Sequence, residues 1–470
     1  MPQPDLVLRG QRVITKESDG PASIHVRGGR IVEVSEFDDV PDGCELFDAG
    51  GFVLMPGLVD SHVHVNEPGR TRWEGFETAT RAAARGGVTT IVDMPLNSVP
   101  PTTTPEGLRE KIEAARGRCR VDVAFWGGLV PGNLGSLAAL REGGVVGFKC
   151  FLIDSGVQEF PNVTESELVP ALYELSRLDA PLIVHAEMPG PVERAHASCC
   201  EGDAAGDPRK YETFLRSRPR EAEDEALALM LRLCRETGAR VHIVHHSSAD
   251  SLALLREAKT GALPFTAETC PHYLTFAAED VPDGATEFKC CPPIRERENR
   301  ERLWEALAEG TIDMVVSDHS PCPPEMKRRQ EGDFMKAWGG ISSLQFRLSV
   351  VWTEASGRGH TLRDLARWLA SEPAKLAGLS ARKGTIAAGR DADFVIFDPE
   401  ARLHVTPEMN EHRHKLTPYE GRELKGDVVA TFLRGEKIYE RGRFNEKPSG
   451  VLLLREPKPS SNWDEDEWDD

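Results

Sequence analysis

The stretch "GLVDSHVHVNEPGRTRWEG", residues 57–75, carries two histidines, His62 and His64, at the end of an apolar run. Alternate residues on a β-strand face the same side. Both imidazoles can therefore reach one site from the end of a single strand. Neutral imidazoles suit Zn²⁺ and similar first-row ions, so the H-x-H pair predicts a metal site at a strand end.

The same apolar texture recurs along the chain, and helical patterns separate the runs. Together with the run that ends in His62 and His64, eight strand-like runs occur between residues 55 and 380. The other seven are "VTTIVDMP", "VDVAFWGGL", "VVGFKCFLID", "APLIVHAE", "ARVHIVHHSS", "LPFTAETCPHY" and "TIDMVVSDHSP". Fully buried parallel strands read as continuous apolar runs. The alternation predicts the α/β class and, within it, a (β/α)8 TIM-type barrel over residues 55–380.

Short runs with a period of two stand at both ends of the chain, as in "DLVLRGQRVI" and "VVATFLRGEKIYERG". We expect them to form one small β-sandwich domain from residues 1–54 and 381–445. Residues 446–470 end in a cluster of carboxylates and are expected to be a mobile acidic tail. Residues 187–220 are long for a connection, and we expect a helical excursion there beside the active site.

The composition limits the partners and the compartment. A formal net charge of −19 argues against nucleic acid and anionic membranes as partners. No apolar stretch approaches the roughly 20 residues of a membrane span, and the start "MPQPDLVLRG" lacks the pattern of a signal or transit peptide. The ten cysteines contain no C-x-x-C, which favours reduced thiols over disulfides. These features predict a cytoplasmic protein.

Catalytic groups of such barrels lie at the carboxyl ends of the strands, and polar residues end five of the predicted strands. Besides the H-x-H pair, these residues are Lys149, His185, His245 and Asp318. Four histidines and one aspartate are more ligands than one tetrahedral ion with an open position needs. They suit two ions that share ligands and activate a water molecule between them.

Lys149 is unusual in this set because an ammonium group is costly to bury, and burial lowers the pKa of the amine. A neutral amine can take up CO₂, and the resulting carbamate could bridge two cations as a carboxylate does. A buried lysine can instead pair with a nearby carboxylate, and any single histidine can be a core residue. For His242, His246, His272 and His319, supporting or packing roles are favoured over metal ligation.

Several stretches resemble those of the cyclic amidohydrolases, the family of dihydroorotases, dihydropyrimidinases (hydantoinases) and allantoinases. They are "GLVDSHVHVNEPG", "GFKCF", "PLIVHAE", "HIVHHSSA", "ETCPHYLTF", "KCCPPIR", "SDHSPC" and "GTIAAGRDADFVIFD". The resemblance extends from about residue 5 to residue 440. Within the family the chain is most similar to the allantoinase branch, through "HVNEPGRTRWEGFETATRAAARGGVTTIVDMPLNSVPPTTT", "GFKCFLIDSGV" and "DFMKAWGGISSLQF".

The resemblance implies a ligand set and a reaction. The first ion would be held by His62 and His64, the bridge would be carboxylated Lys149, and the second ion would be held by His185 and His245. Asp318 would ligate the first ion and also shuttle a proton. The enzyme would open the hydantoin ring of allantoin to give allantoate. Zn²⁺ is the default metal, with Mn²⁺, Co²⁺ or Fe²⁺ as alternatives, and a dimer or tetramer of identical chains is implied.

Departures from the family patterns separate its branches. Dihydroorotases carry an arginine where this chain has Asn66, and loss of that bidentate partner counts against a carboxylate substrate. Dihydropyrimidinases usually have a tyrosine shortly after the bridging lysine, where this chain reads "KCFLIDS". Hydrolysis of other cyclic ureides by a hydantoinase is the alternative within the same class. A non-catalytic scaffold of the same fold is the alternative in another class.

Four residues are candidate contacts to the substrate. Asn97 in "MPLNS" can donate and accept hydrogen bonds with a ureido group, although it also fits a turn ahead of Pro100. Arg70 could orient the substrate or be an ordinary surface arginine. Cys291 replaces the serine usual in the family, and Gly340 lies in "WGGISS", where dihydropyrimidinases carry an asparagine.

Overall fold

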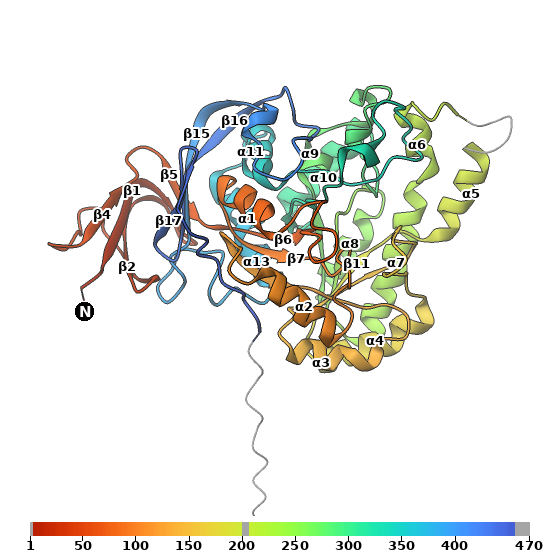
Figure 1. The fold of residues 1–470 in the computed structure, drawn as a ribbon, viewed down its shortest axis with the longest axis horizontal. Coiled ribbons are helices and arrows are strands. Elements are labelled where there is room, and N and C mark those ends of the chain that lie inside the picture. Colours follow the sequence, from red (N-terminus) through yellow and green to blue (C-terminus); the bar gives the residue numbers. More distant parts are fainter. Residues whose placement is uncertain (1–2, 200–205, 456–470) are drawn as a thin grey trace, which may run out of the picture.

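The computed structural model describes residues 3–199 and 206–455. Within them, parallel strands alternate with helices as the sequence predicts, so the chain is an α/β protein (Figure 1). The strands are β6 (Leu58–Val63), β7 (Val88–Asp93), β8 (Asp122–Phe125), β9 (Gly127–Gly128), β10 (Phe148–Phe151), β11 (Leu182–His185), β12 (Val241–Ile243), β13 (Phe265–Thr269) and β14 (Met314–Val315). One sheet has the order β6-β7-β8, and the other has the order β14-β13-β12-β11-β10-β9.

Hydrogen bonds connect the two parallel sheets at both edges of the smaller one. The amide of Val146, ahead of β10, donates to the carbonyl of Phe125 in β8 at 2.9 Å. At the other edge, the amide of His64 after β6 donates to the carbonyl of His319 after β14 at 2.8 Å. The sheets are therefore joined, and because their strands are parallel, the carboxyl ends lie at one end of the pair.

Helices follow the strands, and local sequence signals set several of their ends. Thr104 caps α2 (Pro105–Ala115) by accepting a hydrogen bond from the amide of Gly107 at 3.1 Å. Gly238, with a φ of 65°, ends α7 (Arg220–Thr237). Other helices are α1 (Phe76–Arg85), α3 (Leu137–Glu142), α4 (Glu165–Arg177), α8 (Leu252–Thr260), α9 (Pro271–Thr275), α10 (Arg297–Glu309), α11 (Arg347–Gly357), α12 (Leu362–Ala366) and α13 (Glu372–Leu376). None of the helices in the described ranges combines the length and hydrophobicity that a membrane span requires.

The long connection between β11 and α7 contains two helices, α5 (Pro189–Cys199) and α6 (Tyr211–Ser217). They lie at the side of the molecule opposite the N-terminus (Figure 1). Residues 200–205 are outside the described residues. The rings of Tyr211 and Phe214 in α6 are buried and pack against Phe334. The described part of the connection is therefore a helical excursion that aromatic packing fixes to the body of the protein.

Strands from both ends of the chain form a further sheet, drawn in red and blue at the left of Figure 1. In the described residues its order is β18 (Arg443–Phe444), β17 (Glu436–Glu440), β16 (Glu423–Leu433), β15 (Phe394–His404), β5 (Val53–Pro56), β1 (Leu6–Ile14), β2 (Asp19–Arg27) and β3 (Arg30–Ser35), with β4 (Glu45–Asp48) beside β1. β5 and β15 are antiparallel, with Met55 opposite Val395. The alternating runs at the two termini therefore belong to one sheet.

A single residue, Gly57, joins this terminal sheet to the parallel strands. It separates β5 from β6, and a Cβ atom at this position would lie 2.4 Å from Oγ1 of Thr89 and 2.9 Å from Cβ of Asp393. Only glycine leaves room for both neighbours. The strand that carries His62 and His64 is therefore anchored directly in the terminal sheet.

The segment before the acidic end differs from the expected mobile tail. The amide of Gly450 donates to the carbonyl of Cys119, and the amide of Leu453 donates to that of Val123 at 2.8 Å. The side chain of Leu453 is buried. The apolar run "GVLLL" thus packs beside β8, so the predicted tail boundary at residue 446 is too early. Residues 456–470, where the carboxylates cluster, lie outside the described residues.

A buried lysine ties the terminal sheet to β8. Nζ of Lys383 lies 2.6 Å from carboxylate oxygens of Asp122 and Asp393, and 2.9 Å from an oxygen of Asp391. Burial lowers the pKa of Lys383, but the three carboxylates outweigh burial and raise it. These aspartates are grouped closely enough to hold a metal ion. Here the ammonium group already supplies the compensating positive charge.

We expect Lys383→Met to destabilise the protein by about 3–5 kcal/mol, because it removes the cation that the three buried aspartates share. Asp122 and Asp391 keep Arg434 and Arg382 as partners, whereas Asp393 loses its ion pair. The measurement is the midpoint of urea unfolding followed by fluorescence. Lys437→Met is the control, since Lys437 is 40 % exposed in its ion pair with Glu440 and exposed pairs contribute at most about 1 kcal/mol. Equal midpoints for the two variants would contradict a structural role for the buried lysine.

Candidate active site

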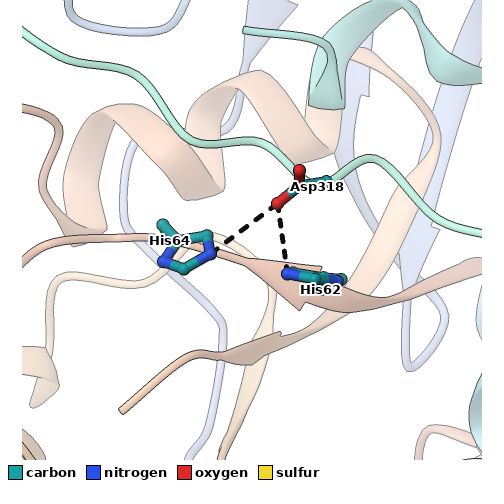
Figure 2. A group of neighbouring side chains, drawn as sticks. All are labelled: His62, His64 and Asp318. Atoms are coloured by element: carbon teal, nitrogen blue, oxygen red, sulfur yellow. Dashed lines mark ion pairs between the residues drawn. The ribbon is translucent and has the colours of Figure 1, made fainter. Parts of the chain in front are cut away.

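His62, His64 and Asp318 meet at the carboxyl ends of β6 and β14 (Figure 2). Nε2 of His62 lies 3.1 Å from Oδ1 of Asp318, and Nε2 of His64 lies 3.7 Å from the same oxygen. All three side chains are buried. Two ring nitrogens and one carboxylate oxygen therefore converge closely enough to hold one metal ion.

A second pair of histidines lies beside this group. Nδ1 of His185, at the end of β11, is 3.0 Å from Nε2 of His245, two residues after β12. The ring centroids of His62 and His245 are 5.4 Å apart. The four histidines that the sequence singled out thus form one continuous cluster.

Lys149 in β10 is buried in the same region. Its Nζ has no hydrogen-bond partner among the described residues and lies 4.9 Å from the ring centroid of Phe151. Burial is the largest cause that lowers the pKa of Lys149, to about 8. No carboxylate pairs with this amine in the described structure, in contrast to the alternative weighed from the sequence. The neutral, reactive fraction of the amine near neutral pH is therefore larger than that of an ordinary lysine.

Two glutamates that sequence analysis missed hold the histidines. Glu268 in β13 accepts hydrogen bonds from Nδ1 of His62 at 2.5 Å and from Nε2 of His242 at 3.0 Å. Glu187 lies 2.8 Å from Nε2 of His185. Glu268 stands inside the apolar run "FTAETC", and Glu187 ends the run "PLIVHAE" two residues after β11. A carboxylate in or directly after a buried strand was the signal that could have identified them.

The carboxylates draw positive charge to this cluster. Burial lowers the pKa of His62, but the charges of Asp318 and Glu268 outweigh burial and raise the pKa to about 9. Burial keeps the pKa values of His64 and His245 well below their usual range. Because a metal cation and a proton compete for the same ring nitrogens, a site that favours the proton on His62 also favours a cation there.

A cavity of about 280 Å³ opens onto the cluster. Its lining includes the six predicted metal ligands and three of the four predicted substrate contacts, Asn97, Cys291 and Gly340. The cavity also reaches Arg218, which follows α6. The long connection after β11 therefore contributes to the wall of the site.

Arg70 is the predicted substrate contact that the structure does not bring to the cavity lining. Its guanidinium donates to the carbonyl of Asn97 at 2.9 Å and forms an ion pair with Glu159. The guanidinium also lies 5.4 Å from the ring centroid of Trp73. Because these partners hold the guanidinium, Arg70 fixes the Asn97 loop and lies outside the cavity lining.

The backbone at the site is held in rare conformations. The φ angles of Asn97, His245 and Asp318 are 64°, 39° and 45°. Residues other than glycine seldom adopt this region, and each such residue costs on the order of 1–3 kcal/mol. At Gly340, with φ of 114°, a Cβ atom would lie 2.2 Å from the carbonyl oxygen of Ser320. The fold thus stores strain where side chains must point into the cavity.

Comparisons with known proteins agree with this geometry. The profile of the amidohydrolase family matches residues 53–438. An allantoinase from Streptomyces avermitilis is 52 % identical over 454 residues, which cover 96 % of this chain and 99 % of the relative. An allantoinase from Arabidopsis thaliana is 44 % identical over 97 % of this chain and 92 % of its own length. The structure of an L-hydantoinase from Arthrobacter aurescens superposes with a TM-score of 0.91 at 32 % identity, covering 96 % of this chain and all of that one.

Proposed function

We propose that this chain, which belongs to the amidohydrolase family, hydrolyses the cyclic amide bond of allantoin and releases allantoate. The observation that carries the proposal is the similarity to allantoinases along almost the whole of both chains. The clustered strand-end residues and the cavity above them give this similarity a chemical basis. The chain is thus a hydrolase that acts on a cyclic carbon–nitrogen bond.

We infer that the two parallel sheets form one closed (β/α)8 barrel over residues 55–380. The hydrogen bonds at both edges of the smaller sheet support this closure, as does the superposition on the L-hydantoinase. Residues 1–54 and 381–445 form the accessory β domain in this proposal. The shared sheet of β1–β5 and β15–β18 supports this division.

Two divalent ions fit the cluster, with Zn²⁺ as the first choice and Mn²⁺, Co²⁺ or Fe²⁺ as alternatives. The imidazole and carboxylate donors suit these metals, and the unpartnered amine of Lys149 fits a bridging carbamate. The proposed ligands are His62, His64 and Asp318 for one ion, His185 and His245 for the other, and carboxylated Lys149 for both. When bound, the ions polarise the ring carbonyl and activate the attacking water.

The protein itself supplies the proton transfer and the substrate contacts. The carboxylate of Asp318 accepts a proton from the attacking water and passes it to the ring nitrogen that leaves. The ring C–N bond breaks, and the former amide carbon becomes the carboxylate of allantoate. The amide of Asn97 can donate to and accept from the ureido group. Cys291 and Gly340, which line the same cavity, are the other proposed substrate contacts.

The amine of Lys149 must be neutral to take up CO₂. Addition of CO₂ to Nζ forms the N–C bond, and loss of the surplus proton leaves a carbamate. The low pKa of Lys149, about 8, supports this step because it raises the neutral fraction. The absence of a carboxylate partner within the described residues leaves the amine free to react.

A substrate panel tests the proposal. We expect kcat/KM for allantoin to exceed that for hydantoin, dihydrouracil and dihydroorotate by about 100-fold or more, because a site built to hydrogen-bond a ureido group rejects analogues that lack it. Metal content is measured on the same sample. Better turnover of hydantoin or dihydrouracil would favour the hydantoinase alternative, which is supported by the structural similarity to the L-hydantoinase. Absence of all four activities in a sample that holds two metal ions per chain would favour the alternative of a non-catalytic scaffold.

We also propose a homo-oligomer, a dimer or tetramer, and a cytoplasmic location. The oligomer rests on the family resemblance. The location is supported by eight cysteines of the described ranges that are free thiols, namely Cys44, Cys119, Cys150, Cys234, Cys270, Cys290, Cys291 and Cys322.

A further inference from the structure

An ion pair between a partly buried arginine and a fully buried glutamate stands directly behind His185. Nε and Nη2 of Arg218 donate to the two carboxylate oxygens of Glu187 at 3.0 and 2.9 Å. Nε2 of His185 lies 2.8 Å from Oε2 of the same carboxylate. Glu187 is fully buried. Arg218 and His185 thus both contact the carboxylate of Glu187. Glu187 contacts Nε2 of His185, whereas His245 lies at Nδ1 of the same ring.

The ion pair determines which nitrogen of His185 is free. Because a bidentate guanidinium keeps the carboxylate of Glu187 ionised, Glu187 can only accept hydrogen bonds. Nε2 of His185 must therefore carry its proton and donate it to Glu187. The unprotonated nitrogen of the neutral ring is then Nδ1, which faces Nε2 of His245 at 3.0 Å.

His62 is held in the opposite sense by a different carboxylate. Its Nδ1 binds Glu268, whose other oxygen accepts from His242. Its Nε2 is therefore the nitrogen that faces Asp318. Each of the two proposed ion positions thus has its own carboxylate on a histidine ring, and each carboxylate exposes a different ring nitrogen. Glu268 also accepts from the main-chain amide of His245 at 3.3 Å, so only Glu187 is confined to one position by its hydrogen bonds to the proposed ligands.

We propose that Arg218 and Glu187 form a positioning pair that sets the affinity of the ion held by His185 and His245, and not that of the ion held by His62 and His64. The inference rests on the proposed function, since it presupposes two ions. Arg218 also lines the cavity and follows α6. The long connection between β11 and α7 is therefore needed to build the ion position at His185 and His245, in addition to lining the cavity.

The test follows each ion separately in Cd²⁺-loaded protein by ¹¹³Cd NMR, with one signal expected for each position. His64→Ala and His185→Ala assign the two signals, because each removes a ligand of one ion. Chelator competition then measures the affinity behind each signal in Glu187→Gln, Glu268→Gln, Arg218→Lys and the wild type. Asp122→Asn is the matched control, since it removes a buried carboxylate at the amino end of β8.

Glu187→Gln is expected to weaken the ion assigned by His185→Ala by about 10- to 100-fold, the usual effect of losing a partner of a metal-bound histidine. The other ion should keep its affinity. Glu268→Gln should weaken the ion held by His62 and His64 the more strongly, with a smaller loss at the other ion because Glu268 also accepts from the main-chain amide of His245. Arg218→Lys keeps the charge but loses the fork, so a smaller loss at the same ion is expected. This variant also tests the proposal if Glu187→Gln fails to fold.

Unchanged affinities in Glu187→Gln, or equal weakening of both ions, would overturn the positioning pair. If Asp122→Asn weakened the affinity of both ions to the same extent, the equal weakening in Glu187→Gln would be assigned to general destabilisation of the protein. A wild-type chain that binds fewer than two ions would instead refute the proposed function, and the inference with it. Two ions in the wild type, with both retained in Glu187→Gln, would refute this inference alone.

Discussion

Asp318→Asn is expected to lower kcat for allantoin by about 10²- to 10⁴-fold, the usual contribution of a positioned general base and acid. Asparagine has the same shape and can still present an oxygen to the neighbouring site, but it cannot accept the proton of the attacking water. In the wild type, burial raises the pKa of Asp318, but the imidazoles of His62 and His64 outweigh burial and hold it well below its usual range. The carboxylate is therefore ionised and ready to accept.

The measurement is steady-state hydrolysis of allantoin at saturating substrate by samples matched for metal content. Asp313→Asn is the control, because Asp313 lies just before the other end of β14 and pairs with Lys259 at 2.6 Å. We expect its kcat to stay at the wild-type value. A kcat near wild type in Asp318→Asn would remove Asp318 from the proton transfer.

Lys149→Ala is expected to abolish loading of two ions and to lower kcat by at least about 10³-fold, because the proposed bridge between the ions is lost and metal catalysis is worth several kcal/mol. Elemental analysis gives the ions per chain, and intact mass spectrometry of the wild type tests for one added CO₂. Lys259→Ala serves as the control, since it changes a half-buried lysine far from the cavity.

Reconstitution separates the carbamate from a purely structural lysine. Metal-free wild-type protein is loaded with Zn²⁺ in buffer stripped of CO₂ and in buffer with bicarbonate. Loading of two ions should require bicarbonate. Two ions per chain in Lys149→Ala, or full loading without CO₂, would defeat the bridging role of Lys149.

The strand-end residues were predictable because each follows its own apolar run. The positions of His62, His185, His245 and Asp318 need only the run and the rule that parallel strands end together. Their clustering within a few ångströms agrees with that expectation. The roles that depended on distant partners could not be read in this way.

Partners far apart in the sequence account for much of what was missed, although Glu187 lies only two residues from His185. Glu268 contacts His62 across 206 residues, and no local pattern records such a pair. Arg70 turns towards Glu159, 89 residues away, so its orientation was equally hidden. The run "GVLLL" near the acidic end was too short to predict a partner, and only its backbone contacts with Cys119 and Val123 reveal one.

Only Gly57 separates β5 from β6, so no linker exists at which a recombinant fragment of the catalytic unit could begin without cutting into a strand. In a fragment that starts at β6 and keeps the rest of the chain, loss of β5 would leave the edge of β15 without its antiparallel neighbour. An unpaired edge of this kind invites association with other chains. Neither unit can therefore be produced alone without exposing the surface at which the two units meet. The position of β6, which carries His62, is thus set by residues of the terminal sheet that take no part in the chemistry.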